Sequence, residues 1–507
     1  MLKDAGVSSP RTGMNLADKR RQAWLLISYA IPVSVTAFLW YSSPNTISLL
    51  QGGLAFVLLG LPWHSYLVWK SGARREIPLF TMVGSAYWLY YAFPLFWGDR
   101  VLVTGGRFQQ LLPDSAISLS ICMAALGAVS LYLGTKTRIG RSDSTAKSVD
   151  ISQKTLSWQY VRFLVVAGCF LSFYQIPAYA LGEGGRQAIY ILQTTIPMVA
   201  FVILLQRHLR REGTDMDRLL IVAFIVSRFF GGMASGWLGS FVFFMATCGL
   251  IYLVHRRKAP KLIVVAGIVC VLFFQVGKDD FRARYWYEGE QGSTLERVAW
   301  WIEASLERWS SAGESTSTVT SRDLVYQSLA RVSLLSQTAN VVILTPSLVP
   351  YQGGKTYSYL FVSFVPRFLW PGKPSVNEAN RFYQVAYGLT KEERLEDVSI
   401  AVGFLTEGYI NFGWFGVIAV PFLIGMMFEY FQKNWLTQDS GLLMTSLGAV
   451  LVCTRFITIE SQLGQYLGGL IQQIVLTLIA FLPVMTVTGR GDQRQQTRLR
   501  ALQTSST

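Results

Sequence analysis

Charged residues within apolar runs are the feature of this sequence most able to do chemistry. Arg228 lies in the run IVSRFFGG, and Arg455 and Glu460 flank the end of a second apolar run. A charge at the centre of a membrane-spanning helix costs roughly 2.5–3.5 kcal/mol, so such residues are candidates for function. Arg455 and Glu460 are five positions apart and share a helical face poorly, which favours separate partners over a local ion pair. The alternative for Arg228 is a side chain that reaches the membrane interface or binds a backbone carbonyl.

A second set of charges lies in the long, less apolar segment from about residue 277 to 400. Its cationic members are Arg282, Arg331, Arg367, Lys373 and Arg381. A guanidinium group presents a planar fork of donors that matches phosphate oxygens, and it stays charged in any environment. The cations therefore indicate a phosphate-bearing lipid as ligand. For Arg282 and Arg381, contacts with lipid headgroups or acidic neighbours are the simpler explanation, so both are secondary candidates.

Glu407 is the carboxylate best placed to act as a base. It lies in the segment Thr406–Tyr409, which is apolar and enters the membrane just before the next predicted span. Loss of water around a carboxylate raises its pKa toward the range of a general base. The alternative is a structural ion pair with one of the arginines. Asp280 is a second possible base, and Glu460 is a secondary candidate because an interfacial carboxylate costs little.

The composition defines the class of protein. The chain is 51% hydrophobic and only 15% charged, whereas a soluble domain has about 25% charged residues. The net charge of +15 is compatible with nucleic acid binding, but its concentration in short loops favours a multi-spanning membrane protein and no nucleic acid partner. The five cysteines all lie in apolar runs, and no cluster of acidic residues is present, so we expect no disulfide, metal or cofactor.

Twelve apolar runs have the length needed to cross a membrane. They lie near residues 24–41, 47–69, 77–98, 115–134, 156–181, 187–206, 218–232, 236–254, 262–276, 414–432, 441–459 and 466–487. We therefore expect an all-α, polytopic membrane protein. Its parts are a tail at 1–22, nine helices over 23–276, a large loop at 277–413, three helices over 414–487 and a tail at 488–507.

The loops predict the orientation of the chain. Basic residues gather at 70–75, 136–154, 207–218, 255–261 and 490–500, whereas residues 277–400 carry thirteen Lys or Arg against fourteen Asp or Glu. Because cytoplasmic loops are enriched in Lys and Arg, both termini are expected in the cytoplasm and the large loop outside it. The span pair between residues 218 and 254 needs a break, which the glycines from Gly231 to Gly236 supply.

The large loop is expected to contain surface helices and no further span. Leu295, Val298, Ile302, Leu306 and Trp309 recur at helical spacing among charged residues, which is typical of an amphipathic helix lying on a membrane. The apolar stretch 332–348 is interrupted by polar residues and by Pro346. An additional crossing there would also conflict with the charge distribution.

Two segments of this loop carry a resemblance to a known family. The sequences FVPRFLWPGKPS at 364–375 and SIAVGFLTEGYINFGWFG at 399–416 resemble the bacterial O-antigen polymerases and related oligosaccharide repeat-unit polymerases. The elements that match in order are Pro366, Arg367, Lys373, Pro374, Glu407, Gly408, Tyr409, Asn411 and Gly413. The match covers about a quarter of the chain, and the rest is similar in topology alone.

The resemblance implies an inner-membrane glycosyltransferase of the C type that acts on the outer leaflet. Donor and acceptor would both be polyprenyl-pyrophosphate-linked oligosaccharides, with membrane lipids, a flippase and a chain-length regulator as possible partners. Attack of an acceptor hydroxyl on the anomeric carbon needs cations at the departing pyrophosphate and a base at the hydroxyl. Under this hypothesis the base or acceptor-positioning residue is Glu407, and the pyrophosphate ligands are Arg228, Arg331, Arg367, Lys373 and Arg455.

Two alternatives remain open at this stage. An O-antigen ligase would have a similar architecture. However, ligases resemble enzymes that use a histidine in the outer loop. Here the histidines are His64, His208 and His255, none of which is expected on the outer side. A lipid-linked oligosaccharide flippase or another transporter would also fit twelve spans, although the long insertion after the ninth span disrupts the matching halves that such folds usually have.

Overall fold

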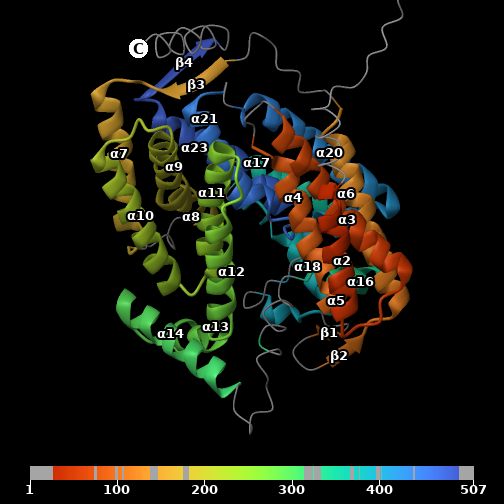
Figure 1. Cartoon of the computed structure of the whole chain (residues 1–507). Coiled ribbons are helices and arrows are strands. Elements are labelled where there is room, and N and C mark those ends of the chain that lie inside the picture. The colour runs from red at the N-terminus through yellow and green to blue at the C-terminus, as the bar shows by residue number, and fades with distance from the viewer. Residues whose placement is uncertain are drawn as a thin grey trace, which may run out of the picture.

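The computed structural model is mostly helical, and its arrangement is shown in Figure 1. It describes residues 27–72, 77–97, 101–104, 108–137, 147–174, 182–312, 324, 333–365, 370, 372–375, 377–395, 400, 402–437 and 440–489.

The first half of the chain is mainly helical. They are α2 (Ala30–Ser42), α3 (Leu49–Ser71), α4 (Leu79–Tyr87), η1 (Trp88–Ala92), α5 (Phe93–Trp97), α6 (Asp114–Gly134), α7 (Thr155–Leu171), α8 (Gly182–Tyr190), η3 (Ile191–Thr195), α9 (Ile196–Leu209), α10 (Asp215–Ala234), α11 (Leu238–Arg256) and α12 (Lys261–Gln275). The break predicted between the spans near 218–232 and 236–254 falls at Gly236, which has a φ of 72° and separates α10 from α11.

The second half alternates short helices with long ones. Its helices are α13 (Lys278–Arg282), η4 (Ala283–Tyr287), α14 (Thr294–Ser311), α16 (Leu335–Leu344), η5 (Lys355–Tyr357), α17 (Ser358–Phe364), α18 (Glu378–Ala386), η6 (Glu392–Arg394), α19 (Gly403–Phe412), α20 (Trp414–Asn434), α21 (Leu442–Leu451), η8 (Val452–Phe456), α22 (Leu463–Gly468) and α23 (Leu470–Phe481).

Each of the twelve apolar runs contains a helix, but the helices differ in length. Among the described residues, six are long and apolar enough to cross a membrane, and the bent pair α12 and α13–η4 would make a seventh. The six are Leu49–Ser71, Asp114–Gly134, Gln187–Leu209, Leu238–Arg256, Trp414–Asn434 and Leu463–Phe481. The chain is therefore compatible with a helical membrane protein, and the number of twelve spans stays a prediction.

Two antiparallel strand pairs lie at opposite ends of the helices. Strands β1 (Val101–Thr104) and β2 (Phe108–Leu111) form a hairpin near α5. Strand β3 (Lys147–Ile151) pairs with β4 (Met485–Gly489), with Val149 opposite Val487. This second pair joins the connection between α6 and α7 to the last described residues of the chain.

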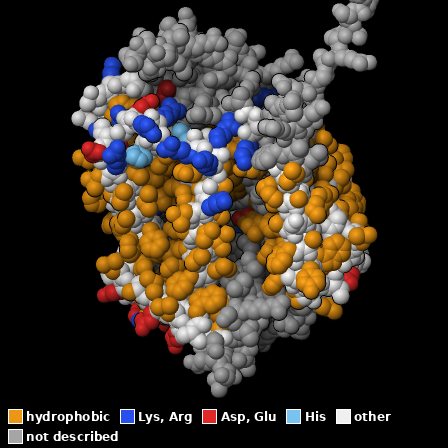
Figure 2. Space-filling view, viewed as in Figure 1, with side chains coloured by type: hydrophobic (Ala, Val, Ile, Leu, Met, Phe, Trp, Pro, Cys, Tyr) orange, Lys and Arg blue, Asp and Glu red, His pale blue; other side chains and the backbone are white. Residues whose placement is uncertain are grey.

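The charged side chains separate along the helix axes. Figure 2 shows a band of Lys and Arg near the end where β3 and β4 lie, and acidic side chains near the end where α13 and α14 lie. We call the first end the basic face, defined by Arg207, Arg210, Arg211, Arg256 and Lys258. The surface between the two ends is largely hydrophobic, as expected for a protein that contacts lipid.

The helices of the large loop fold against the rest of the molecule. Helix α14 begins with a capping box formed by Ser293 and Glu296 and buries Val298 and Trp301 while Leu306 is exposed. The expected helix is present, but Leu295 and Ile302 of its predicted apolar face are exposed as well, and its position on a membrane stays a prediction. The stretch 332–348 forms only the short helix α16, which packs against α6.

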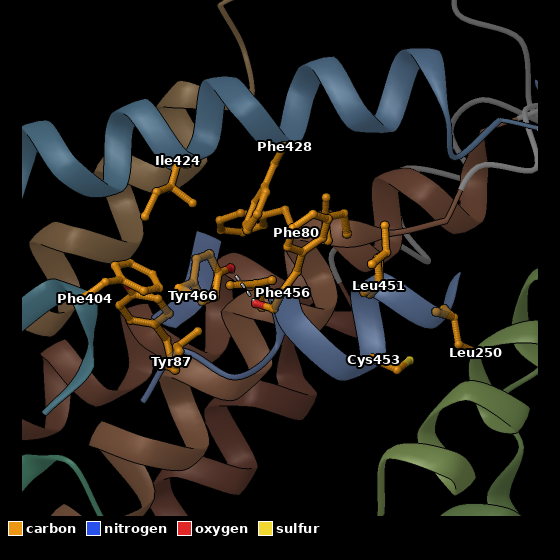
Figure 3. Packing of buried hydrophobic residues seen from close by; sticks show 14 of the residues in the cluster. Phe80, Tyr87, Leu250, Phe404, Ile424, Phe428, Leu451, Cys453, Phe456 and Tyr466 are labelled. Carbon is orange, nitrogen blue, oxygen red and sulfur yellow. Dashed lines mark hydrogen bonds between the residues drawn. The ribbon is translucent and has the colours of Figure 1, made fainter. Parts of the chain in front are cut away.

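The core closes around the segment 457–462 that connects η8 to α22. Figure 3 shows Phe404, Phe428, Phe456 and Tyr466 packed together at this place, where α19, α20, η8 and α22 meet. The Tyr466 hydroxyl donates a hydrogen bond of 2.8 Å to the Phe456 carbonyl oxygen. This bond joins the two ends of the connecting segment, so its conformation is fixed from both sides.

Candidate functional site

A cavity of about 1680 Å³ lies between α4 on one side and α11 and α12 on the other. Pockets for small molecules are typically about 300–1,000 Å³, so this cavity suits a larger ligand. It appears as the hollow near the centre of Figure 2. Its back wall is made by η8, α22 and the residues that precede α18.

The lining of the cavity is divided by chemical type. From Leu238 to Leu253 on α11 and from Pro260 to Leu272 on α12, every lining residue is apolar or glycine. The polar and charged lining residues lie on the other walls and at the α13 end of α12. They are Ser85, Tyr90, Gln187, Tyr190, Gln275, Lys278, Lys373, Ser375, Asn377, Arg381, Thr454, Arg455, Thr458, Glu460, Ser461, Gln465 and Gln472. Such a lining fits an amphiphile with a polar head and a long apolar tail.

Arg455 is held at the polar wall by neighbours from two other helices. Its Nε donates a hydrogen bond of 3.1 Å to Gln473 Oε1, and Gln473 Nε2 donates one of 2.8 Å to Thr195 Oγ1. Both Arg455 and Gln187 approach Gly469, where the absence of a side chain leaves room for them. The guanidinium is thus positioned at the cavity without a carboxylate partner among the described residues.

Arg228 contacts the same π-helical segment, η3, from the other side. Its Nη2 donates to the carbonyl oxygens of Gln193 and Thr194 at 3.1 and 3.3 Å. A π-helical turn frees carbonyl oxygens from the regular helix pattern and is common at functional sites. Arg228 does not line the cavity, although Tyr190, which does, interacts electrostatically with both arginines. The backbone-carbonyl alternative considered for Arg228 is therefore what the structure displays.

Glu460 lines the cavity and is half-buried at its polar wall. It hydrogen-bonds with the Tyr90 hydroxyl, and its Oε2 is buried without a hydrogen-bond partner among the described residues. Burial raises the pKa of Glu460 above its ordinary value. A buried carboxylate with an unused oxygen costs free energy unless a ligand or water satisfies it.

Glu407 is completely buried beside the cavity and does not line it. Its Oε1 accepts a hydrogen bond from the Thr356 hydroxyl at 2.7 Å, and its Oε2 accepts one from the Leu463 backbone N–H at 2.6 Å. Helix α19 is too short to span a membrane, and burial raises the pKa of Glu407 to about 7. Both oxygens are thus occupied, one by Thr356 of η5 and the other by Leu463, the first residue of α22.

The remaining predicted residues divide between the cavity and the surface. Lys373 and Arg381 line the cavity: Lys373 Nζ donates to the Val365 carbonyl at 2.7 Å, and Arg381 pairs with Glu378 at 3.0 Å. Asp280 instead pairs with Arg308 at 2.7 Å. Arg282 lies over the Trp286 ring, 4.3 Å from its centroid.

Arg331 and Arg367 lie outside the described residues, as does Pro366. Their assignment to the pyrophosphate stays a prediction from the sequence. Of the resemblance elements that the structure describes, Lys373 and Pro374 line the cavity, whereas Glu407 is completely buried and does not line it.

Several cavity residues carry no pattern that sequence reasoning could have used. Tyr90, Gln187 and Tyr190 belong to helical segments in which uncharged polar residues are unremarkable, as does Gln473, which holds Arg455. A signal was present only for Lys278, which ends an apolar run just before Asp279. Its approach to residues from α18 and η8 depends on the three-dimensional arrangement.

One comparison with known proteins identifies a family. Residues 117–446, which are more than half of the chain, match a family described as a domain of unknown function, DUF8712, and the chain belongs to that family. Neither the curated proteins nor the solved structures contain a match.

Proposed function

We propose that this protein is a membrane glycosyltransferase that joins polyprenyl-pyrophosphate-linked oligosaccharide repeat units into a surface polysaccharide. The observation that carries the proposal is the cavity with one apolar wall and an opposite wall bearing Lys373, Arg381, Arg455 and Glu460. The apolar wall suits the lipid tail, and the cations suit the pyrophosphate. The basic face would lie in the cytoplasm and the α13–α14 end outside it, in keeping with the charge of the loops.

The reaction would use the cations to stabilise the leaving group. As the anomeric carbon–oxygen bond breaks, negative charge develops on the pyrophosphate, and preorganised donors are most effective where charge develops. Arg455 is the best-positioned donor, because Gln473 and Thr195 fix its orientation. Lys373 is the second, and Arg331 and Arg367 are further candidates from the sequence.

The alternative of transport has less support. A transporter for the charged head would need polar groups along its path to both faces. The cavity lining on α11 and α12 stays apolar as far as Leu253 and Pro260, which lie toward the basic face. A ligase would share the donor site and differ in its acceptor, so the acceptor used distinguishes it from a polymerase.

The proposal is tested by supplying purified protein with a lipid-linked repeat unit as the only substrate. Laddered polymer is the expected product, and Arg455→Ala should slow its formation by about 10²-fold, the usual effect of removing one charge-stabilising donor. Arg308→Ala, which removes an exposed guanidinium paired with Asp280 away from the cavity, serves as control. Absence of a ladder with the wild type, or an unchanged rate in Arg455→Ala, would contradict the proposal.

A further inference from the structure

Of the acidic side chains that the structure describes, Glu460 is the one that lines the cavity. It lies in the segment between η8 and α22, on the same wall as Arg455. The Tyr90 hydroxyl hydrogen-bonds with the Glu460 carboxylate, and Oε2, which is buried, has no partner among the described residues. An unsatisfied carboxylate oxygen on a residue that lines a cavity is stabilised when a ligand hydroxyl bonds to the carboxylate.

The segment that carries Glu460 is fixed by contacts from two elements, α18 and α19. Gln462 Nε2 donates to the Ala379 carbonyl at 3.1 Å, and the Leu463 N–H donates to Glu407 Oε2. Helix α19 begins at Gly403, which packs so closely that an added Cβ would lie 2.8 Å from the Ile459 carbonyl oxygen. Glu460 is therefore held in place, as a catalytic group must be.

The charged and titratable groups around Glu460 come from several elements. Tyr90 on η1 bonds to it, and Tyr466 on α22 interacts with it electrostatically. Glu407 lies behind the segment, and the cations that line the same cavity are Lys278, Lys373, Arg381 and Arg455. No ion pair involves Glu460 within the described part of the chain, so its charge is not committed to a structural partner.

We propose, on the basis of the function proposed above, that Glu460 accepts the proton of the acceptor hydroxyl, whereas Glu407 only positions the segment that carries Glu460. The acceptor O–H bond breaks and its proton moves to the Glu460 carboxylate. The acceptor oxygen forms a bond to the anomeric carbon of the donor. The anomeric bond to the lipid pyrophosphate breaks, and its electron pair leaves with the pyrophosphate. Glu460 then returns its proton to water.

The test compares the rate of ladder formation against pH in four full-length proteins: wild type, Glu460→Gln, Glu407→Gln and Tyr90→Phe. Glu460→Gln should lose about 10²–10⁴-fold in rate, the usual contribution of a general base, while retaining the thermal stabilisation by the lipid-linked donor. Tyr90→Phe removes a hydrogen bond that lowers the pKa of Glu460. In this variant the acidic limb of the pH–rate profile should therefore shift to higher pH. A purely structural role of Glu460 would not cause such a shift.

Glu303→Gln, which changes an exposed carboxylate on α14, is the matched control and should behave as wild type. In Glu407→Gln the thermal stability should fall while the midpoint of the acidic limb stays in place. The assignment is overturned if Glu460→Gln works within threefold of wild type, or if the limb moves in Glu407→Gln and not in Tyr90→Phe. A wild type that makes no ladder contradicts the proposed function itself, which is a different result.

Discussion

At the scale of single residues, Glu407 and Glu460 differ in what their oxygens contact. Glu407 accepts hydrogen bonds at both oxygens from groups of the protein, whereas Glu460 has one buried oxygen without a partner among the described residues. If burial alone were the criterion for a general base, Glu407 would be the stronger candidate, because it is completely inaccessible to solvent. A base must reach its proton, so access decides between them.

The stability of the protein should depend on pH through Glu407. Its pKa rises from the ordinary value of 4.5 to about 7, so between these values the native state binds a proton that the unfolded state has released. Stability therefore increases as the pH falls from about 7 to 4.5 and decreases as it rises, by at most about 1.4 kcal/mol per pH unit. Thermal unfolding in detergent at pH 5.5 and 7.5 measures this difference.

Glu407→Gln should flatten that pH dependence. The control is Thr356→Val, which removes a hydrogen-bond donor from Glu407 Oε1 and leaves the carboxyl able to titrate. The control should unfold at a lower temperature and retain the dependence. If thermal stability changed with pH equally in wild type and Glu407→Gln, groups other than Glu407 would be the cause of the pH dependence.

At the scale of elements, the positions of Arg228 and Arg455 depend on the π-helical segments η3 and η8 and on the break between α22 and α23. Arg228 binds the carbonyl oxygens of η3, and Arg455 reaches the same segment through Gln473 and Thr195. The connection between α22 and α23 passes Arg455 at Gly469. The guanidinium position thus depends on elements separated by more than 250 residues in the sequence.

Gly469→Ala should impair activity without unfolding the protein. A Cβ there would lie 2.9 Å from Arg455 Nη2 and 3.0 Å from Gln187 Nε2, the ends of two flexible side chains that can move. We expect at least about a tenfold loss in the rate of ladder formation, since small misplacements of catalytic groups are costly. The unfolding temperature should be nearly unchanged.

Gly53→Ala is the matched control, because a Cβ at this position on α3 meets nothing within 4 Å. Alanine in place of an exposed helical glycine should stabilise the protein by about 1 kcal/mol and leave the rate unchanged. If Gly469→Ala forms the ladder as fast as Gly53→Ala and wild type do, the exact position of Arg455 does not matter for activity, and the prediction is wrong.

At the scale of the whole molecule, charge is distributed between two ends separated by a hydrophobic belt. The basic face gathers loops from distant parts of the chain, and the strand pair β3–β4 lies at the same end. Cytoplasmic loops are the ones enriched in Lys and Arg. The polar wall of the cavity includes Lys278 at the start of α13, toward the other end.

Cysteine labelling tests this orientation. Lys258 follows α11 at the basic face, and Gln291 precedes α14 at the opposite end. In intact cells, a membrane-impermeant maleimide should label Gln291→Cys and leave Lys258→Cys unlabelled, whereas both should react after permeabilisation. Wild type is the control, because its five cysteines lie in helices. The reverse pattern would invert the topology.

The sequence by itself determined the class of fold, the presence of a helix in each long apolar run and the separation of charge. These properties follow from local composition, because the length of an apolar run and the charge of a loop are readable without any tertiary contact. The break before α11, the amphipathic helix α14 and the absence of a long helix at 332–348 were predicted for the same reason.

Only the tertiary structure decided which charged residues lie together. Arg455, Lys373, Arg381 and Glu460 meet at one cavity, whereas Asp280 pairs at the surface and Arg228 binds backbone behind Tyr190. Our proposal reverses the roles that the sequence predicts for the two glutamates, because access and hydrogen-bond partners depend on neighbours far away in the chain. Spacing along a sequence contains no information on which oxygen a distant Thr356 or Leu463 will occupy.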